Sequence, residues 1–176
     1  MRMCTGILHN NWMGRFVLLA TLPLAMLLAG CGSSDGDSDS ASLVVGNAAE
    51  RCSLLKGSAI PAAEIGLPTR GGTITEASLQ APDATAGLPE FCRVRGQIAS
   101  SNAADPPINF QLNLPTTWNR KSLQFGGGGF NGVVVTGLDN VPHVPSTAAK
   151  PLARGYLTFG GDSGHTGMDG VFGLNA

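Results

Sequence analysis

Two segments of the chain alternate strictly between apolar and polar residues, and this pattern predicts an antiparallel pair of strands. Residues 92–98 are Cys-Arg-Val-Arg-Gly-Gln-Ile, and residues 108–114 are Ile-Asn-Phe-Gln-Leu-Asn-Leu. A sustained period of two is typical of a strand with one buried face. Residues 105–107, Asp-Pro-Pro, lie between the two segments and favour a turn. The β-rich run 73–79 predicts a further strand upstream.

A short helix that carries Cys52 is expected over residues 48–56. Asn47 followed by Glu50 resembles an N-cap residue with its third-position carboxylate. Gly57 is suited to end the helix, because glycine adopts the positive φ of a helix end without a steric penalty.

Beyond residue 118 the pattern changes to short apolar strands that each run into a glycine-rich loop. In chain order these strands and loops are residues 122–125, 126–132, 156–159 and 160–165. Residues 146–154 predict a helix that ends at Gly155, with Pro151 beginning or kinking it. Strand, loop, helix and strand form a β-α-β unit, so the fold class is predicted as α/β with both glycine loops at the carboxyl ends of strands, where sites form.

The run of four glycines from Gly126 to Gly129 exposes backbone N–H groups without hindrance from Cβ atoms. The spacing matches neither a P-loop nor a dinucleotide-binding motif. An oxyanion hole is the chemistry left, and a simple tight bend is the alternative.

Residues 161–164, Gly-Asp-Ser-Gly, match the nucleophile motif of trypsin-like proteases. That chemistry needs a His and an Asp well upstream, and only His143 is available before it in the folded part. The β-α-β pattern is also wrong for two β-barrels, so a protease is not expected. Asp162 and His165 are expected to support the loop, with a shared hydrogen bond or a place in a pocket as the alternative.

The amino-terminal region predicts export. Arg15 precedes an uncharged run that ends in Leu-Ala-Gly-Cys at Cys31, which resembles the lipobox of bacterial lipoproteins. We therefore expect a signal peptide over 1–30, lipidation of Cys31 and outer-membrane sorting facing the periplasm or surface, with an uncleaved anchor as the alternative. The true start is either Met1 or Met13. Residues 31–47 are expected to be a flexible Gly/Ser/Asp tether, and the folded part to occupy 48–176.

Of the four cysteines, Cys4 lies in the signal segment and Cys31 would carry lipid. Cys52 and Cys92 remain, and an oxidising compartment permits a disulfide between them, with two buried thiols as the alternative. No zinc or other metal site is expected, because His143 and His165 show no ligand spacing with these cysteines. A net charge of −1 also argues against nucleic acid as a partner.

Several motifs together resemble the tannase and feruloyl esterase family, including its hydrolase of mono(2-hydroxyethyl) terephthalate. The matches in chain order are Cys52 with Leu54 and Leu55, residues 88–94, Leu114-Pro115, Trp118-Asn119, Gly126 to Gly132, Arg154-Gly155-Tyr156 and residues 162–165. Residues 119–121 depart from the family's usual Asn-Gly-Arg.

The resemblance implies the first part of an α/β-hydrolase fold and a Ser-His-Asp esterase mechanism. It assigns the backbone N–H of Gly129 to the oxyanion hole, with Gly126, Gly127, Gly128 and Gly132 supporting the loop, and matches Cys52 and Cys92 to a family disulfide. The nucleophile elbow, the catalytic residues and the lid domain would follow Ala176, so no catalytic residue lies in this chain and the chain alone is expected to be inactive. Strand 156–159 would then lie beside strands formed by the sequence after Ala176, and its edge would be unpaired in this chain.

The resemblance further implies phenolic esters as substrates and no cofactor in this chain, with a structural calcium only in the lid. Membrane contact would come through the lipid anchor alone. The alternative from another class is a small outer-membrane lipoprotein that binds a ligand without catalysis.

Overall fold

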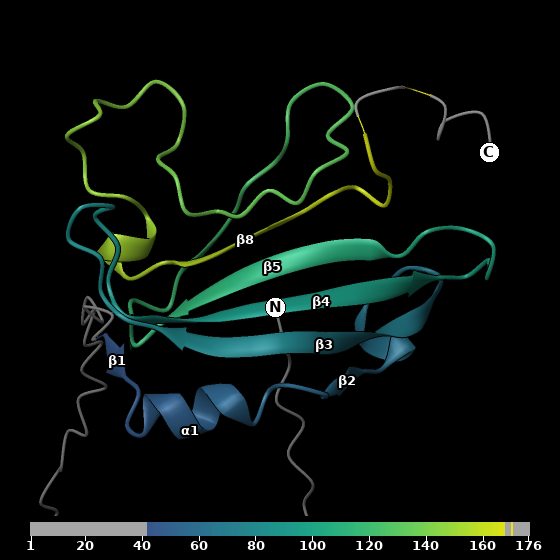
Figure 1. Ribbon diagram of the computed structural model, residues 1–176, viewed down its shortest axis with the longest axis horizontal. Helices are drawn as coiled ribbons and strands as arrows, with labels where there is room; N and C mark the ends of the chain where they lie inside the picture. The colour runs from purple at the N-terminus through teal and green to yellow at the C-terminus, as the bar shows by residue number, and fades with distance from the viewer. Residues whose placement is uncertain (1–41, 168–169, 171–176) are drawn as a thin grey trace, which may run out of the picture. The chain divides into compact units, whose positions relative to one another are not determined.

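Three long antiparallel strands form the centre of a six-stranded mixed sheet (Figure 1). The structure is a computed structural model and describes residues 42–167 and 170. The central strands are β3 (Thr69–Gln80), β4 (Phe91–Ser100) and β5 (Ile108–Pro115). The β4–β5 register pairs Cys92 with Leu114 and Ile98 with Ile108, so the two alternating segments face one another along their whole length. The predicted antiparallel pair is confirmed.

The remaining strands are short and complete the order β2-β3-β4-β5-β8-β7. They are β2 (Ala59–Ile60), β7 (Ser122–Gln124) and β8 (Leu157–Gly161). β8 is antiparallel to β5 and parallel to β7. The expectation that the strand after Tyr156 faces an open side is therefore wrong, because this strand is paired on both sides and, among the described residues, β7 is the edge.

The connection from β7 to β8 lacks the helix predicted over 146–154. Its regular structure is limited to a 3-10 turn, η2 (Leu152–Arg154), which ends at Gly155 with φ 81° as expected. The Asn140 side chain donates to the carbonyl of Ala148 at 3.0 Å, and Pro151 has no N–H to continue a helical ladder. A carbonyl needed early in the helix is thus bound elsewhere. The described fold is mainly β-sheet, and the crossover between its parallel strands is a long loop.

Helix α1 (Ala48–Ser53) forms where a helix was expected, with Cys52 buried on it. The predicted N-cap is wrong: Asn47 has φ 52° in the left-handed region and its side chain makes no capping hydrogen bond. A side-chain cap needs the extended backbone of a usual N-cap residue. Gly57 adopts φ 84° and donates its N–H to the carbonyl of Ile74 at 2.8 Å, which ties the end of this segment to β3.

The apolar face of the sheet packs against α1 through a disulfide between Cys52 and Cys92, whose Cα atoms lie 5.6 Å apart. Val94 completes the buried cluster, and partly buried residues surround it: Leu55, Ile74, Ala77, Leu79, Leu112 and Leu114. Figure 1 shows α1 beside β3 and the β7–β8 connection beside β8. The prediction of a disulfide rather than two thiols is confirmed.

The opposite face of β5 is polar and is also buried. Gln111 and Asn113 of β5 and Thr158 of the neighbouring β8 are at most 1% exposed. Asn113 donates from Nδ2 to Thr158 Oγ1 at 2.9 Å and to the Thr136 carbonyl at 2.7 Å, and Gln111 donates to the same carbonyl at 3.3 Å. The β7–β8 connection therefore covers the face that alternation alone would leave to solvent.

A second, two-stranded ladder joins β1 (Leu43–Val44) to β6 (Thr117–Trp118). Val45 extends it by donating to the Thr116 carbonyl at 2.9 Å. Residues 43–45 lie within the range 31–47 expected to be a tether, but here they are paired with the chain that follows β5. The boundary near residue 48 is thus too late.

The rest of the amino-terminal prediction falls on residues 1–41, outside the described residues. These include the signal peptide over 1–30 and the lipidated Cys31. In the part of the chain that is described, which also holds the 3-10 turn η1 (Ala62–Glu64), no helix has the length and apolar character needed to cross a membrane.

Replacing both Cys52 and Cys92 by Ala should lower the free energy of unfolding by roughly 4 kcal/mol, on the chain-entropy estimate for a sequence separation of 40. Chemical denaturation of the oxidised protein and the double variant measures this difference. The wild type under reducing conditions serves as the control and should approach the double variant. Equal stability of the oxidised and reduced wild type would contradict the prediction.

Stability should also depend on pH through Glu76. The Arg93 guanidinium donates to this carboxylate at 2.9 Å and, with a contribution from Arg95, holds the pKa of Glu76 below its usual 4.5. Because the folded-state pKa is the lower one, ionised Glu76 stabilises the fold above the unfolded pKa, and this contribution is lost as pH falls through the folded pKa. Glu76→Gln should therefore lower the thermal midpoint near neutral pH and approach the wild type in acid.

Thermal midpoints measured from about pH 7 down to about pH 3 test this dependence. Glu64→Gln is the matched control, since Glu64 forms no ion pair in the described part of the chain. A wild-type to Glu76→Gln difference that stays constant with pH would rule out the ion pair as its cause.

Candidate functional site

The two glycine-rich loops lie together at one edge of the sheet, as their positions after parallel strands predict. β7 and β8 run in the same direction, so the loops that follow them leave the sheet side by side. Val135 donates its N–H to the Gly161 carbonyl at 3.2 Å, and Gly167 donates to the Gly132 carbonyl at 3.1 Å. Hydrogen bonds thus join the loops directly.

Residues 128–131 form a tight turn within the first loop. The N–H of Asn131 donates to the Gly128 carbonyl at 3.1 Å, which closes the turn, and Gly129 occupies its second position with φ 57°. A positive φ there is the mark of a primed turn and suits glycine. In the described part of the chain, no hydrogen bond engages the N–H of Gly128 or Gly129. These two donors are therefore available to a bound group.

The other glycines of this loop differ in whether the space around them would accept a side chain. A Cβ on Gly127 would overlap the side chain of Asn131, and one on Gly132 would overlap the backbone of Gly167. Gly126 and Gly128 have open space around the same position. Gly127 and Gly132 are thus needed for close packing, and Gly129 for its backbone conformation.

Asn131 is the residue of this site that sequence reasoning did not single out. Its Nδ2 donates to the Gly161 carbonyl and to Ser163 Oγ, each at 3.0 Å. Its backbone has φ 44°, a conformation that Asn tolerates better than most residues. An Asn within a glycine-rich turn was the available signal, but only the fold shows that its amide reaches the second loop.

Asp162 is buried and serves as an anchor for the second loop. Its Oδ1 accepts from the backbone N–H groups of Asn109 and Gly164 at 3.0 and 2.9 Å, and its Oδ2 accepts from Asn109 Nδ2 at 2.6 Å. These bonds fasten the turn after β8 to the start of β5. His165 is 6% exposed, so it is packed within the same region. A role for either residue in a substrate pocket stays a prediction.

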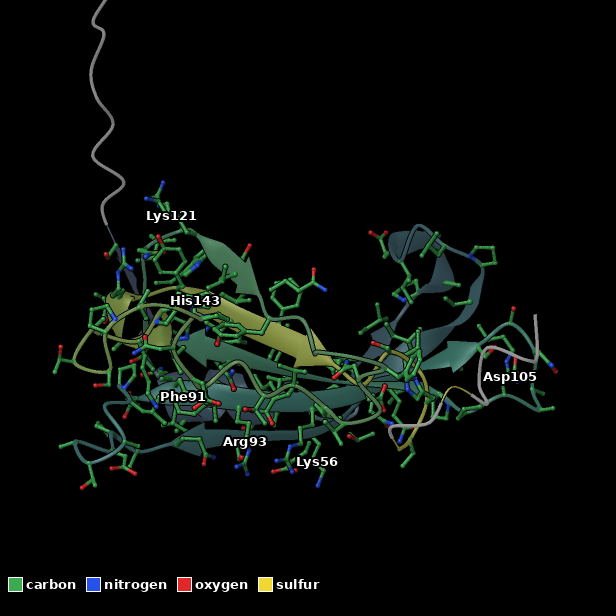
Figure 2. The ribbon with its side chains drawn as sticks, turned by 90° about the horizontal axis from the view of Figure 1, so that it is seen from above. Lys56, Phe91, Arg93, Asp105, Lys121 and His143 are labelled. Carbon is green, nitrogen blue, oxygen red and sulfur yellow. A yellow bond between two sulfur atoms is a disulfide. The ribbon has the colours of Figure 1, made fainter. Side chains whose placement is uncertain are left out.

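A serine-protease arrangement of Ser163 and His143 does not occur. Ser163 lines a groove of about 470 Å³ together with Asp105 and Ile108. Figure 2 shows His143 on the β7–β8 connection, toward the end of the sheet away from Asp105. The two side chains therefore belong to opposite ends of the fold, and His143 is in no position to act on Ser163.

Two residues of β4 lie away from the second glycine loop, whose Ser163 lines the same groove as Asp105. Figure 2 shows Phe91 and Arg93 toward the end of the sheet opposite Asp105.

Within residues 42–167 and 170, no three His, Cys, Asp or Glu side chains gather as a possible metal site. The expectation that this chain holds no metal stays a prediction.

Comparison with known proteins relates part of this chain to one family. Residues 92–176, which include both glycine loops, match the family model of tannase and feruloyl esterase. The chain is 44% identical over 120 residues to an uncharacterized esterase of Agrobacterium fabrum, a match that covers 68% of this chain and 22% of that protein. It is 34% identical over 83 residues to the mono(2-hydroxyethyl) terephthalate hydrolase of Piscinibacter sakaiensis, covering 46% of this chain and 13% of that protein.

The family resemblance inferred from the sequence motifs is thereby confirmed over residues 92–176. The first relative is named as an esterase, and the second is named as a hydrolase of mono(2-hydroxyethyl) terephthalate. The matched segments span less than a quarter of either relative's length.

The packing of the first loop predicts unequal effects of Ala at adjacent glycines. Gly127→Ala should lower the free energy of unfolding by about 1–3 kcal/mol, because the new methyl group overlaps Asn131. Gly126→Ala is the matched control and should change it by less than about 0.5 kcal/mol, since nothing lies near its Cβ position. Chemical denaturation of both variants tests this; equal losses would show that the Asn131 contact is not the cause.

Proposed function

We propose that this chain is the amino-terminal part of an exported carboxylic ester hydrolase of the tannase and feruloyl esterase type that acts on phenolic-acid esters. The observation that carries the proposal is the 128–131 turn. It presents the N–H of Gly129, which no hydrogen bond engages in the described part of the chain, at the carboxyl ends of two parallel strands. The turn also lies within the segment that matches the family.

Ester hydrolysis through a serine passes through a tetrahedral intermediate whose oxygen carries negative charge. Backbone N–H groups fixed before the reaction stabilise this charge without reorganising, and loss of one such donor costs about 10²–10³ in kcat. The role proposed for Gly129 is that of one oxyanion donor. Gly127 and Gly132 then serve by allowing the packing that fixes the turn.

The Ser, His and Asp of the mechanism are proposed to lie in sequence that follows Ala176, in the rest of an α/β-hydrolase fold with a lid domain. The antiparallel strands followed by a parallel β7–β8 pair support this fold. In such folds one oxyanion donor comes from the loop after an early strand and the other from beside the nucleophile. The edge strand β7 has a free side for a further strand in the described part of the chain.

The remaining features of the proposal rest on the sequence. We propose that the protein is an outer-membrane lipoprotein anchored through Cys31. We further propose that this chain holds no cofactor or metal, that the lid holds a structural calcium, and that the protein has no nucleic-acid partner. The small phenolic ester would be the only ligand.

A ligand-binding lipoprotein without catalysis is the second candidate. The observation that favours it is an apolar groove of about 430 Å³ beside the disulfide, lined in part by Leu43, Leu55 and Leu114. This groove is built by α1, β1 and β5 and lies on the face of β5 opposite Gln111 and Asn113.

An activity assay separates the two candidates. Methyl gallate and methyl ferulate should be hydrolysed by the gene product extended beyond Ala176, and a serine-directed reagent should abolish the saturable turnover. The 176-residue chain alone should show none, because the proposed nucleophile lies in the sequence that follows Ala176. Serine-reagent-sensitive turnover by the 176-residue chain, or no ester hydrolysis by the extended product, would contradict the proposal.

A further inference from the structure

We propose that Asn131 is a positioning residue that fixes the oxyanion turn against the end of β8. This inference rests on the proposed function and adds to it a side chain that sets where the Gly129 donor lies. The residue touches both glycine loops and belongs to the turn itself.

The backbone of Asn131 determines the geometry of the turn. Asn131 closes it, because its own N–H donates to the Gly128 carbonyl at 3.1 Å. The N–H of Gly129, at the second position, takes no part in this bond. A movement of Asn131 would therefore change the direction in which the Gly129 N–H points.

The side chain of Asn131 ties the turn to the neighbouring loop. Asn131 Nδ2 donates to the Gly161 carbonyl and to Ser163 Oγ at 3.0 Å each. Asp162 lies between these acceptors in sequence and is bound to Asn109 of β5. The side chain thus connects the turn to a loop that is itself fixed to the sheet.

The space around the Asn131 side chain is set by the first loop. Gly127 leaves room for the Asn131 amide to pack directly on the backbone of the first loop. The amide is held between residue 127 on one side and residues 161 and 163 on the other. A side chain clamped in this way has few rotamers open to it, so its position is well defined.

The chemistry expected of such a residue is indirect. Asn131 has no role in the transfer of a proton or in attack on the ester, and its amide hydrogens are used within the protein. An error of about 1 Å in placing a catalytic donor can lower the rate by about 10²-fold. A defect at Asn131 should therefore act on kcat more than on KM.

Asn131→Asp is the test variant, because it keeps the shape of the side chain, removes the Nδ2 donor and places negative charge beside the Gly161 carbonyl. Asn140→Asp is the matched control. Asn140 lies in the same connection and also donates to a backbone carbonyl, that of Ala148 at 3.0 Å, which belongs to neither glycine loop.

In the extended gene product with methyl gallate, Asn131→Asp should lower kcat on the order of tenfold or more while KM changes less than about twofold. Asn140→Asp should leave both constants near those of the wild type at a similar thermal midpoint. An unchanged kcat in Asn131→Asp, or equal losses in the two variants, would overturn the proposal.

Hydrogen exchange provides a readout that needs no activity. The N–H groups of Val135 and Gly167 bridge the two loops, and both should exchange faster in Asn131→Asp but not in Asn140→Asp. If Asn131→Asp does not fold, Ser163→Ala takes its place, since it removes one acceptor at an exposed position and should speed the same two amides by a smaller factor. Unchanged exchange at both amides would overturn the proposal. If the extended wild type hydrolyses no ester, the proposed function fails, and the exchange data alone decide whether Asn131 positions the turn.

Discussion

The side-chain amides of Gln111 and Asn113 hold the β7–β8 connection onto the sheet by donating to one carbonyl, that of Thr136. The side chains of Gln111, Asn113 and Thr158 are at most 1% exposed. A buried polar group without a partner would cost about 1–3 kcal/mol, so this network is satisfied only when the connection is in place. The first glycine loop lies directly upstream of Thr136, and its placement depends on that attachment.

The strand β5 connects the disulfide cluster with the β7–β8 connection, because each of its faces packs against a different part of the chain. Leu112 and Leu114 face the disulfide cluster that fastens α1 to β4. Gln111 and Asn113 face the connection that carries the proposed oxyanion turn. The covalent bridge stiffens the sheet from one side, and the amide network fixes the loop on the other. Loops held on a rigid sheet in this way are where protein function is usually found.

The sequence located the candidate site but did not predict the role of each residue in it. Parallel strands place their following loops at the same edge, so the meeting of the two glycine loops could be predicted from their order. The separate requirements of Gly127 and Gly132 could not, because they depend on where the fold places the Asn131 side chain and the Gly167 backbone. Asn131 escaped notice for the same reason: its partners Gly161 and Ser163 belong to the other loop.

The sequence by itself determined the β4–β5 pair, helix α1, the disulfide and the family to which residues 92–176 are related. These follow from local periodicity, from cysteine number and from ordered motifs. Only the tertiary structure decided that residues 146–154 form no long helix, that β8 lies inside the sheet, and that the polar face of β5 is buried. A short segment gains too little from local hydrogen bonds to fix its own conformation, so distant partners choose it. Alternation likewise shows that the two faces of a strand differ, while the chain that covers each face is set by the fold.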